Sequence, residues 1–377
     1  MRALVLILDS VGCGGAPDAG DYGDEGADTL GHIFARTQGL ALPNLDALGL
    51  AAIMGREGPE PRASWGRMRE RSAGKDTTTG HWEIAGVVLE KPFGTFTRFA
   101  DNLVRAIEHE AGVEFIGNYP QSGTVILEEL GVEHVRSGKL ILYTSADSVM
   151  QIAAHENLVP LKRLYEICSI ARRHADAFRI GRVIARPFVG ESGAWKRTSG
   201  RHDFSLFPPH TVLNAITDAA LPVHGVGKIS DIFAGSGITD STPTTSNAEG
   251  MAVLDRLWGE TDRGLIFANL VDFDMLFGHR RNVAGYAQAL AEFDAWLPQF
   301  LDRVQLDDLV IITADHGNDP TWHGTDHTRE EVPLLVLRQA HADRLGTRLT
   351  FADVAASLAT YFQLPEPWPV GTPFLAA

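Results

Sequence analysis

Continuous apolar runs constrain the fold of this chain more than any other feature. Residues 3–8 read "ALVLIL" and are followed directly by Asp9. A strand that is apolar on both faces must be covered on both sides, as in a parallel sheet between two layers of helices. Similar runs occur in "LIFANLVDFD" (265–274), "DLVIITADHG" (308–317) and "VPLLVLR" (332–338). The sequence therefore predicts a largely parallel sheet that is buried on both faces.

Amphipathic segments lie among these runs. The segment "PNLDALGLAA" (43–52) opens with a proline that suits a first helical turn, and "AGYAQALAEFDAWLPQFLDRV" (284–304) has apolar residues at helical spacing. In "TFADVAASLATYF", Thr350 and Asp353 predict a capping box. Alternating strands and helices predict the α/β class, with an open sheet flanked by helices on both faces.

The middle of the chain reads as a smaller α/β unit of its own. Helix-like "FADNLVRAIEHEAG" and "LKRLYEICSIARRHA" accompany strand-like "KLILYTSADSV" and "RIGRVIARPFVG". The acidic and histidine motifs lie before and after this block, so we expect residues 92–210 to be an insertion. Residues 1–91 and 211–377 would then form one core domain, which agrees with the two domains expected from 377 residues.

Composition excludes several classes of protein. The net charge of −15 argues against nonspecific binding of nucleic acid or anionic membranes. Only two cysteines occur, Cys13 and Cys168, so no disulfide framework is implied. The N-terminal apolar run is too short for a signal segment, and no later run would span a bilayer. We expect a cytoplasmic protein without a nucleic-acid, membrane or obligate protein partner, and the oligomeric state stays open.

Acids and histidines gather where the expected strands end. Asp9, Asp274, Asp315 and His316 follow such strands, and ligands bind at the carboxyl ends of strands in open α/β sheets. The same segments also carry His279, His323 and His327. Carboxylates with imidazoles suit Mn²⁺, Zn²⁺ or Fe²⁺. The set is too large for one tetrahedral ion and fits two ions roughly 3.5–4 Å apart; the alternative is a scatter of solvated loop residues and buried histidines.

A run of three threonines, residues 77–79 in "GKDTTTGHWEIAG", lies in what resembles a loop. A hydroxyl is a weak nucleophile near neutral pH unless a base or a metal ion lowers its pKa. Beside a metal pair, such a hydroxyl could accept a phosphoryl group. Without the metal ligands, the run would be an ordinary turn capped by Asp76.

Together these motifs resemble the prokaryotic phosphopentomutase family of the alkaline phosphatase superfamily. The resemblance rests on "LDSVGCGGAPDA", "GADTLGHI", "GKDTTTGHWEIAG", "YTSADSVMQIAAHE", "GRVIARPFVG", "GVGKISDIF", "NLVDFDMLFGHRRNVAGYA" and "ADHGNDPTWHGTDHTREEVP", in that order. It implies an alkaline-phosphatase-like core with an inserted cap that closes over the substrate. It also implies two Mn²⁺ ions, a sugar bisphosphate such as glucose 1,6-bisphosphate as activating primer, and a role in nucleoside salvage.

The resemblance also assigns residues in the core. One ion would be held by Asp9, Asp315 and His316, and the other by Asp274, His279 and His327. The nucleophile would be Thr77, four residues before His81, with Thr78 and Thr79 as rival hydroxyls. His323 matches no ligand position of the family.

In the cap, the resemblance indicates a phosphate clamp. Arg186 in "IARPF" and Arg201 in "SGRHDF" are similar to the family's ligands for the sugar 5-phosphate. A planar guanidinium suits this role because it binds phosphate bidentately and keeps its charge. Asp147, with Ser145 beside it, resembles a ribose-hydroxyl contact, and Lys228 would add positive charge near the substrate.

The activity implied by the resemblance is the interconversion of ribose 1-phosphate, or 2-deoxyribose 1-phosphate, and the 5-phosphate. It would proceed through a phosphothreonine enzyme and a 1,5-bisphosphate. Three alternatives stay open: a phosphomonoester hydrolase, a mutase acting on phosphoglycerate, and a catalytically inactive protein that binds metal or sugar phosphate.

Overall fold

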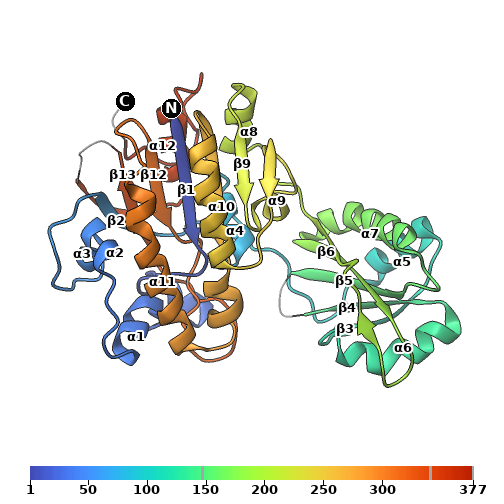
Figure 1. The fold of residues 1–377 in the computed structure, drawn as a ribbon. Helices are drawn as coiled ribbons and strands as arrows, with labels where there is room; N and C mark the ends of the chain where they lie inside the picture. The colour runs from blue at the N-terminus through green and yellow to red at the C-terminus, as the bar shows by residue number, and fades with distance from the viewer. Residues whose placement is uncertain (146–147, 339–341, 376–377) are drawn as a thin grey trace. The chain divides into compact units, whose positions relative to one another are not determined.

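The chain forms two compact units, each with its own sheet. The structure, a computed structural model, describes residues 1–145, 148–338 and 342–375. Unit 1 comprises Met1–Pro92 and Pro208–Ala377, and unit 2 comprises Phe93–Phe207. Figure 1 shows the elements of both units.

Unit 1 is built on an eight-stranded sheet. Its strands, from one edge to the other, are β10 (Asp240–Thr242), β9 (Val223–Val226), β11 (Gly264–Leu270), β1 (Arg2–Leu8), β12 (Leu309–Thr313), β13 (Val332–Leu337), β2 (Ser64–Met68) and β14 (Arg344–Arg348). Only β13 runs antiparallel to both of its neighbours. The expected α/β class with a largely parallel sheet flanked by helices is confirmed.

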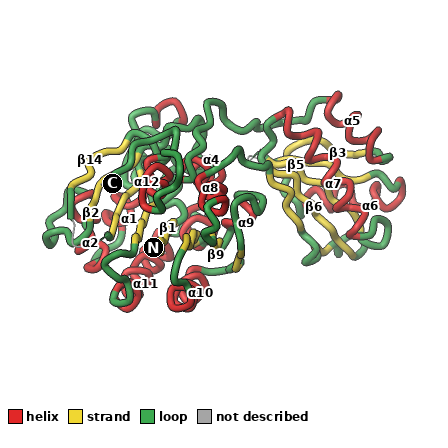
Figure 2. The backbone as a smooth tube through the Cα atoms, turned by 90° about the horizontal axis from the view of Figure 1, so that it is seen from above, coloured by secondary structure: helices red, strands yellow, loops and turns green. Residues whose placement is uncertain are grey.

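Helices cover both faces of this sheet. The helices of unit 1 are α1 (Thr29–Arg36), α2 (Pro43–Leu48), α3 (Leu50–Ile53), α4 (Thr77–Ile84), α8 (Val212–Asp218), α9 (Ile229–Ile232), α10 (Asn247–Glu260), α11 (Val283–Leu301) and α12 (Asp353–Tyr361), with a 3₁₀ turn η1 (Ala19–Tyr22) and a π-helical turn η3 (Phe273–Gly278). On one face α11 contacts α1, α2 and α10, and on the other α4 and α12 contact each other (Figure 2). This double cover explains why β1, β11 and β12 are apolar along almost their whole length.

The capping box expected at Thr350 and Asp353 is absent from the described residues, because α12 begins at Asp353 with Ala352 as its N-cap. The Thr350 hydroxyl instead donates to Glu83 Oε1 at 2.7 Å. A tertiary hydrogen bond to a buried carboxylate has replaced the local cap. Among the described residues, no helix combines the length and apolar character needed to cross a membrane.

Unit 2 has a smaller mixed sheet and its own core. Its strands are β3 (Phe115–Pro120), β4 (Leu140–Thr144), β5 (Val149–His155), β6 (Arg182–Val189) and β7 (Lys196–Arg197) in that order, with β8 (His202–Ser205) also paired to β6. Its helices are α5 (Asp101–Ala111), α6 (Val125–Ser137) and α7 (Leu161–Ala175), followed by the 3₁₀ turn η2 (Asp176–Phe178).

Alternation along β4 separates two hydrophobic clusters in unit 2. Leu140 and Leu142 pack with residues of α5 and α7, whereas Ile141 and Tyr143 pack with residues of α6. Successive side chains of a strand point to opposite faces, so the sheet of unit 2 is also covered on both sides.

A neutral histidine joins α6 to β5. The Nδ1 atom of His134 lies 2.6 Å from the carbonyl oxygen of Lys139, and its Nε2 atom accepts a hydrogen bond of 2.9 Å from the backbone N–H of His155. An imidazole can accept at Nε2 only while it is neutral. Burial, together with the neighbouring His155, holds the pKa of His134 below its ordinary value, although the Lys139 carbonyl acts in the opposite direction.

This arrangement predicts that unit 2 loses stability in mild acid. An unfolded histidine has a pKa of about 6.5. Because the folded pKa of His134 is lower, the unfolded state binds more protons as the pH falls below that value, and the free energy of unfolding decreases. Urea titrations between pH 7.5 and 5.5 should show this decrease.

The variant His134→Leu should be less stable at pH 7.5 and should show a flatter pH dependence. His109→Gln, which replaces an exposed histidine of α5, is the matched control and should keep the wild-type pH dependence. Parallel curves for wild type and His134→Leu would contradict the prediction.

Candidate active site

The carboxyl ends of β1, β11 and β12 bring distant acids together. Asp9 directly follows β1, whose last residue Leu8 is paired with Leu270 of β11. The backbone N–H of Asp9 donates a hydrogen bond of 3.3 Å to the carbonyl oxygen of Leu270. The N–H of Ser10 donates to Asp315 Oδ1 at 3.1 Å, which fixes Asp315, two residues beyond β12, against the end of β1. Asp9 and Asp315 are both fully buried.

All six predicted ligands lie in one cluster. Ligand atoms of Asp9, Asp315 and His316 lie within 4.8 Å of one another, and so do those of Asp274, His316 and His327. The sixth, His279, has its Nε2 atom 3.1 Å from Asp274 Oδ2. The family resemblance implies that His316 belongs to one group, whereas in the structure it is close to both.

Asp274 reaches this cluster from a π-helical turn. The strand β11 ends at Leu270, and Asp274 lies in η3, which begins at Phe273. Expecting Asp274 directly at a strand end was therefore wrong. The π turn places Asp274 and His279, its C-cap residue, close enough for side-chain contact. Such turns occur frequently at functional sites.

Burial and like charge disturb the titration of Asp9. Burial raises its pKa to about 7, with Asp315 adding to the rise. Lys228, whose Nζ lies 3.6 Å from Asp9 Oδ2, acts in the opposite direction. Asp9 Oδ1 is buried and accepts no hydrogen bond from the residues that the structure describes. A buried carboxylate oxygen without a donor is stable only next to a cation or when the group is protonated.

Histidine and asparagine side chains contact all three acids of the cluster. Burial by itself raises the pKa of Asp274, but His327 and the hydrogen bond from His279 bring the pKa well below its ordinary value. Asn318 Nδ2 also donates to Asp274 Oδ1 at 2.7 Å. His81 Nδ1 lies 3.0 Å from Asp315 Oδ2, and Asn269 Nδ2 donates to Asp9 Oδ2 at 3.2 Å.

The donor set fits divalent cations. It consists of carboxylate oxygens and imidazole nitrogens without a thiolate, which suits Mn²⁺, Fe²⁺ or Zn²⁺. Three buried carboxylates carry more negative charge than Lys228 alone offsets. The two triads share His316 and together contain five candidate ligand residues.

The threonine run forms the first turn of α4. Asp76 is the N-cap and accepts hydrogen bonds from the N–H groups of Thr78 and Thr79. The Thr79 hydroxyl donates to Asp76 Oδ2 at 2.6 Å, whereas Thr77 Oγ1 lies 3.1 Å from His316 Nε2. The Thr77 hydroxyl thus lies against a predicted metal ligand, whereas that of Thr79 is bound to its own cap residue.

Glycine at position 80 allows this approach. A Cβ atom on Gly80 would lie 2.0 Å from the carbonyl oxygen of Asp315. Only a residue without a side chain lets the first turn of α4 come this close to the ligand segment.

Unit 2 carries a cluster of cationic side chains around Tyr143. The register places Tyr143 opposite Gln151, and Arg186 Nε donates to Gln151 Oε1 at 2.9 Å. Burial, with Arg201 and Arg197 nearby, lowers the pKa of Arg186. A guanidinium N–H of Arg197 hydrogen-bonds the Tyr143 hydroxyl. Three arginines close enough to disturb one another are suited to hold an anion.

Of the three remaining predicted residues, Ser145 and His323 belong to neither cluster as far as the structure describes it. Ser145 follows β4 and is half-buried, and Asp147 lies outside the described residues. His323 is exposed and is absent from both ligand groups found among the described residues.

Sequence reasoning missed several residues that contact these sites. They are His81, Asn269 and Asn318 in unit 1, and Gly123, Tyr143, Gln151 and Arg197 in unit 2. His81 and Asn318 lie inside the motifs "TTTGH" and "ADHGND", so their position was a usable signal. Gly123 and Arg197 carried no such signal.

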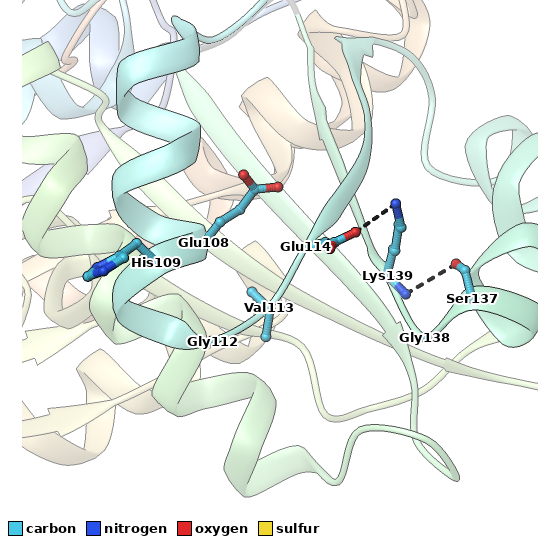
Figure 3. A pocket seen from close by; sticks show the side chains of 8 residues that line it. All are labelled: Glu108, His109, Gly112, Val113, Glu114, Ser137, Gly138 and Lys139. Carbon is cyan, nitrogen blue, oxygen red and sulfur yellow. Dashed lines mark hydrogen bonds and ion pairs between the residues drawn. The ribbon is translucent and has the colours of Figure 1, made fainter.

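A cavity of about 580 Å³ in unit 2 is unrelated to either cluster. It lies at the C-terminal ends of α5 and α6 and is lined by residues such as Glu108, Glu114 and Lys139 (Figure 3). Glu114 and Lys139 form an ion pair of 2.6 Å across it. Its lining, as far as the structure describes it, contains no predicted site residue.

Comparisons with known proteins agree with this chemistry. The model of the metalloenzyme superfamily matches residues 1–366. A phosphopentomutase of Anaeromyxobacter dehalogenans (strain 2CP-C) is 52% identical, with 100% of this chain and 97% of that protein covered. A phosphopentomutase of Syntrophotalea carbinolica is also 52% identical, covering 96% of this chain and 95% of that protein.

Solved structures support the fold. The PH0037 protein of Pyrococcus horikoshii has a TM-score of 0.51 at 16% identity, covering 98% of this chain and 99% of that one. The phosphoglycerate mutase of Leishmania mexicana has a TM-score of 0.50 at 11% identity, covering 100% and 97%. With relatives at 52% identity over its full length, the chain belongs to the phosphopentomutase family of the metalloenzyme superfamily, a family of isomerases.

Proposed function

We propose that the protein interconverts ribose 1-phosphate, or 2-deoxyribose 1-phosphate, and the corresponding 5-phosphate. The names of the relatives at 52% identity support this activity. The observation that carries it is the Thr77 hydroxyl, 3.1 Å from His316 Nε2 at a buried cluster of carboxylates and imidazoles. A hydroxyl in that position is suited to carry a phosphoryl group.

Two Mn²⁺ ions would occupy the cluster. Asp9 and Asp315 would hold one and Asp274, His279 and His327 the other, with His316 close to both. When bound, the ions lower the pKa of an adjacent hydroxyl and offset the charge of the transferring phosphoryl group.

In the proposed reaction, phosphorylated Thr77 transfers its phosphoryl group to the 5-hydroxyl of ribose 1-phosphate, or to the 1-hydroxyl of the 5-phosphate in the reverse direction. The Thr77 O–P bond breaks, an O–P bond to the sugar hydroxyl forms, the proton of that hydroxyl passes to the Thr77 oxygen, and the sugar becomes a 1,5-bisphosphate. The other phosphate then returns to Thr77, so the enzyme ends in its starting state. A sugar bisphosphate primer would supply the first phosphoryl group.

The arginines of unit 2 would bind the sugar phosphate. Arg186 and Arg201 would hold it bidentately, and Arg197, fixed by Tyr143, would add a third cation. A Cβ on Gly123 would lie 1.7 Å from Arg197 Nη2, so glycine leaves the room that Arg197 needs. Lys228 would supply positive charge beside Asp9.

The activity is tested by following both the sugar and free phosphate. Purified protein with Mn²⁺ and a catalytic amount of glucose 1,6-bisphosphate should convert ribose 1-phosphate to ribose 5-phosphate with little free phosphate. Free phosphate as the main product would indicate the hydrolase instead. Conversion of 3-phosphoglycerate, with none of the pentose, would indicate the other mutase.

The nucleophile is tested by intact mass. Protein treated with the bisphosphate primer should gain one phosphoryl group, and Thr77→Val should gain none and lose activity by a factor on the order of 10⁴ or more. Thr78→Val is the matched control, because it replaces the neighbouring hydroxyl with the same isosteric group. Labelling that persists in Thr77→Val and disappears in Thr78→Val would transfer the role to Thr78.

Metal binding should stabilise the fold, because cations relieve the repulsion among the buried carboxylates. For metal-free protein, Mn²⁺ at about 1,000 times its dissociation constant should raise the melting temperature on the order of 10 °C. Asp9→Asn should reduce this rise substantially. Asp302→Asn, which removes an exposed carboxylate at the end of α11, should keep the wild-type rise. An equal rise in wild type and Asp9→Asn would show that Asp9 binds no ion.

A further inference from the structure

One buried arginine holds the loop that leads into Thr77. Residues 70–76 run from the end of β2 to the N-cap of α4. Arg329 donates to the carbonyl oxygens of Glu70, Ser72 and Gly74 at 2.6, 2.9 and 2.5 Å. Alternate carbonyl groups of this loop therefore converge on a single guanidinium.

The Arg329 side chain is itself fixed. It is 2% exposed and forms ion pairs with Glu70 Oε2 at 2.7 Å and with Asp18 Oδ2 at 2.8 Å. Its guanidinium carbon lies 4.9 Å from the centre of the Tyr22 ring. All three guanidinium nitrogens donate hydrogen bonds. A planar group with five N–H donors in a fixed geometry is suited to such a set of acceptors.

The carboxyl group of Glu83 binds backbone N–H groups of the same loop, whereas Arg329 binds its carbonyl groups. Glu83 lies in α4, is fully buried, and accepts hydrogen bonds from the N–H groups of Arg71 at 2.9 Å and Ser72 at 2.6 Å. Carbonyl groups of the loop are thus bound by a buried cation and N–H groups by a buried anion. The loop has little freedom to move relative to either.

Arg329 also belongs to the segment that carries the metal ligands. It lies two residues after His327, and its own N–H donates to Asp24 Oδ2 at 2.9 Å. Asp24 in turn pairs with Lys75 of the loop at 2.9 Å. The ligand segment and the threonine loop are therefore connected by the ion pairs of Arg329 with Glu70 and of Asp326 with Lys75, and also through Asp24.

We propose that Arg329 is a positioning residue that sets the Thr77 hydroxyl against the metal centre. The inference rests on the proposed function, in which Thr77 is the nucleophile. Arg329 itself touches neither Thr77 nor a predicted ligand side chain in any contact that the structure records among its described residues. It acts through the backbone of residues 70–74.

The rate of in-line phosphoryl transfer depends strongly on where the Thr77 hydroxyl lies, so a loosened loop should slow the reaction. A displacement of about 1 Å at the reacting atoms reduces the rate on the order of 100-fold. A lysine at position 329 would keep the positive charge, but its ammonium group is a compact point charge and cannot span three carbonyl groups. Arg329→Lys should therefore fold while leaving the loop incompletely held.

The experiment compares Arg329→Lys with wild type in the full chain with Mn²⁺ and glucose 1,6-bisphosphate. We expect kcat for ribose 1-phosphate to fall about 100-fold. KM should change less than about threefold, because the arginines of unit 2 are unaltered, and bound Mn²⁺ should stay at the wild-type level. A loss of stability alone would also lower the apparent kcat at constant KM, because less enzyme would be folded, but bound Mn²⁺ would then fall in the same proportion.

The control is Arg2→Lys, the same substitution at an ion-paired arginine whose side chain is 14% exposed. Arg2 pairs with Asp308 at 2.5 Å and donates to the carbonyl oxygen of Trp258 at 2.7 Å. It lies at the start of β1, whereas Asp9 follows the end of that strand. We expect Arg2→Lys to lower the melting temperature and to keep kcat within about twofold of wild type.

Two results would overturn the inference alone: a kcat for Arg329→Lys within threefold of wild type, or an equal fall of kcat in Arg2→Lys. Should Arg329→Lys fail to fold, Glu70→Gln, which removes a charge partner of Arg329 with little change in size, must show the same fall in kcat at constant KM. Wild type that fails to convert the pentose, or that is phosphorylated elsewhere than Thr77, overturns the proposed function and the inference with it.

Discussion

The burial of three carboxylates at one edge of a parallel sheet is the constraint on which the rest of this structure depends. Asp9, Asp274 and Asp315 have lost nearly all contact with solvent, and Asp9 Oδ1 accepts no hydrogen bond from the described residues. Such a group is stable only if cations or protons offset its charge. The surrounding imidazoles and Lys228 supply part of that charge, and divalent cations are suited to supply the rest.

The sheet order makes this concentration of charge possible. Strands β11, β1 and β12 are neighbours although 255 or more residues of sequence separate β1 from the other two. Their parallel register places the residues after Leu8, Leu270 and Thr313 at one edge. The apolar side chains that bury these strands on both faces therefore also place Asp9 and Asp315, whereas Asp274 additionally depends on the π-helical turn. The parallel pairing of β11, β1 and β12 thus accounts both for the core of the sheet and for the position of its acidic edge.

Sequence patterns predicted the fold class well because burial on both faces leaves a continuous apolar run. They predicted local geometry less well where a tertiary contact decided it. The Thr350 hydroxyl donates to Glu83 and forms no capping box. Asp274 lies in a π-helical turn, which hydrophobic periodicity does not indicate. For the site, residue type and motif order identified the candidate ligands. The shared place of His316 and the contact between Arg197 and Tyr143 depend on strand register, which the sequence does not display.

The run of three threonines shows how helix geometry distinguishes chemically equal side chains. Asp76 caps α4, and a helix N-cap can bind the hydroxyl at N3 as well as the N–H groups at N2 and N3. The Thr79 hydroxyl is therefore held by Asp76, while Thr77, at N1, is too early in the helix for that contact and faces His316. Because Gly80 permits α4 to approach Asp315, the N1 position coincides with the ligand cluster. The position of each hydroxyl relative to the cap therefore separates Thr79, which is bound to Asp76, from Thr77, which lies against His316.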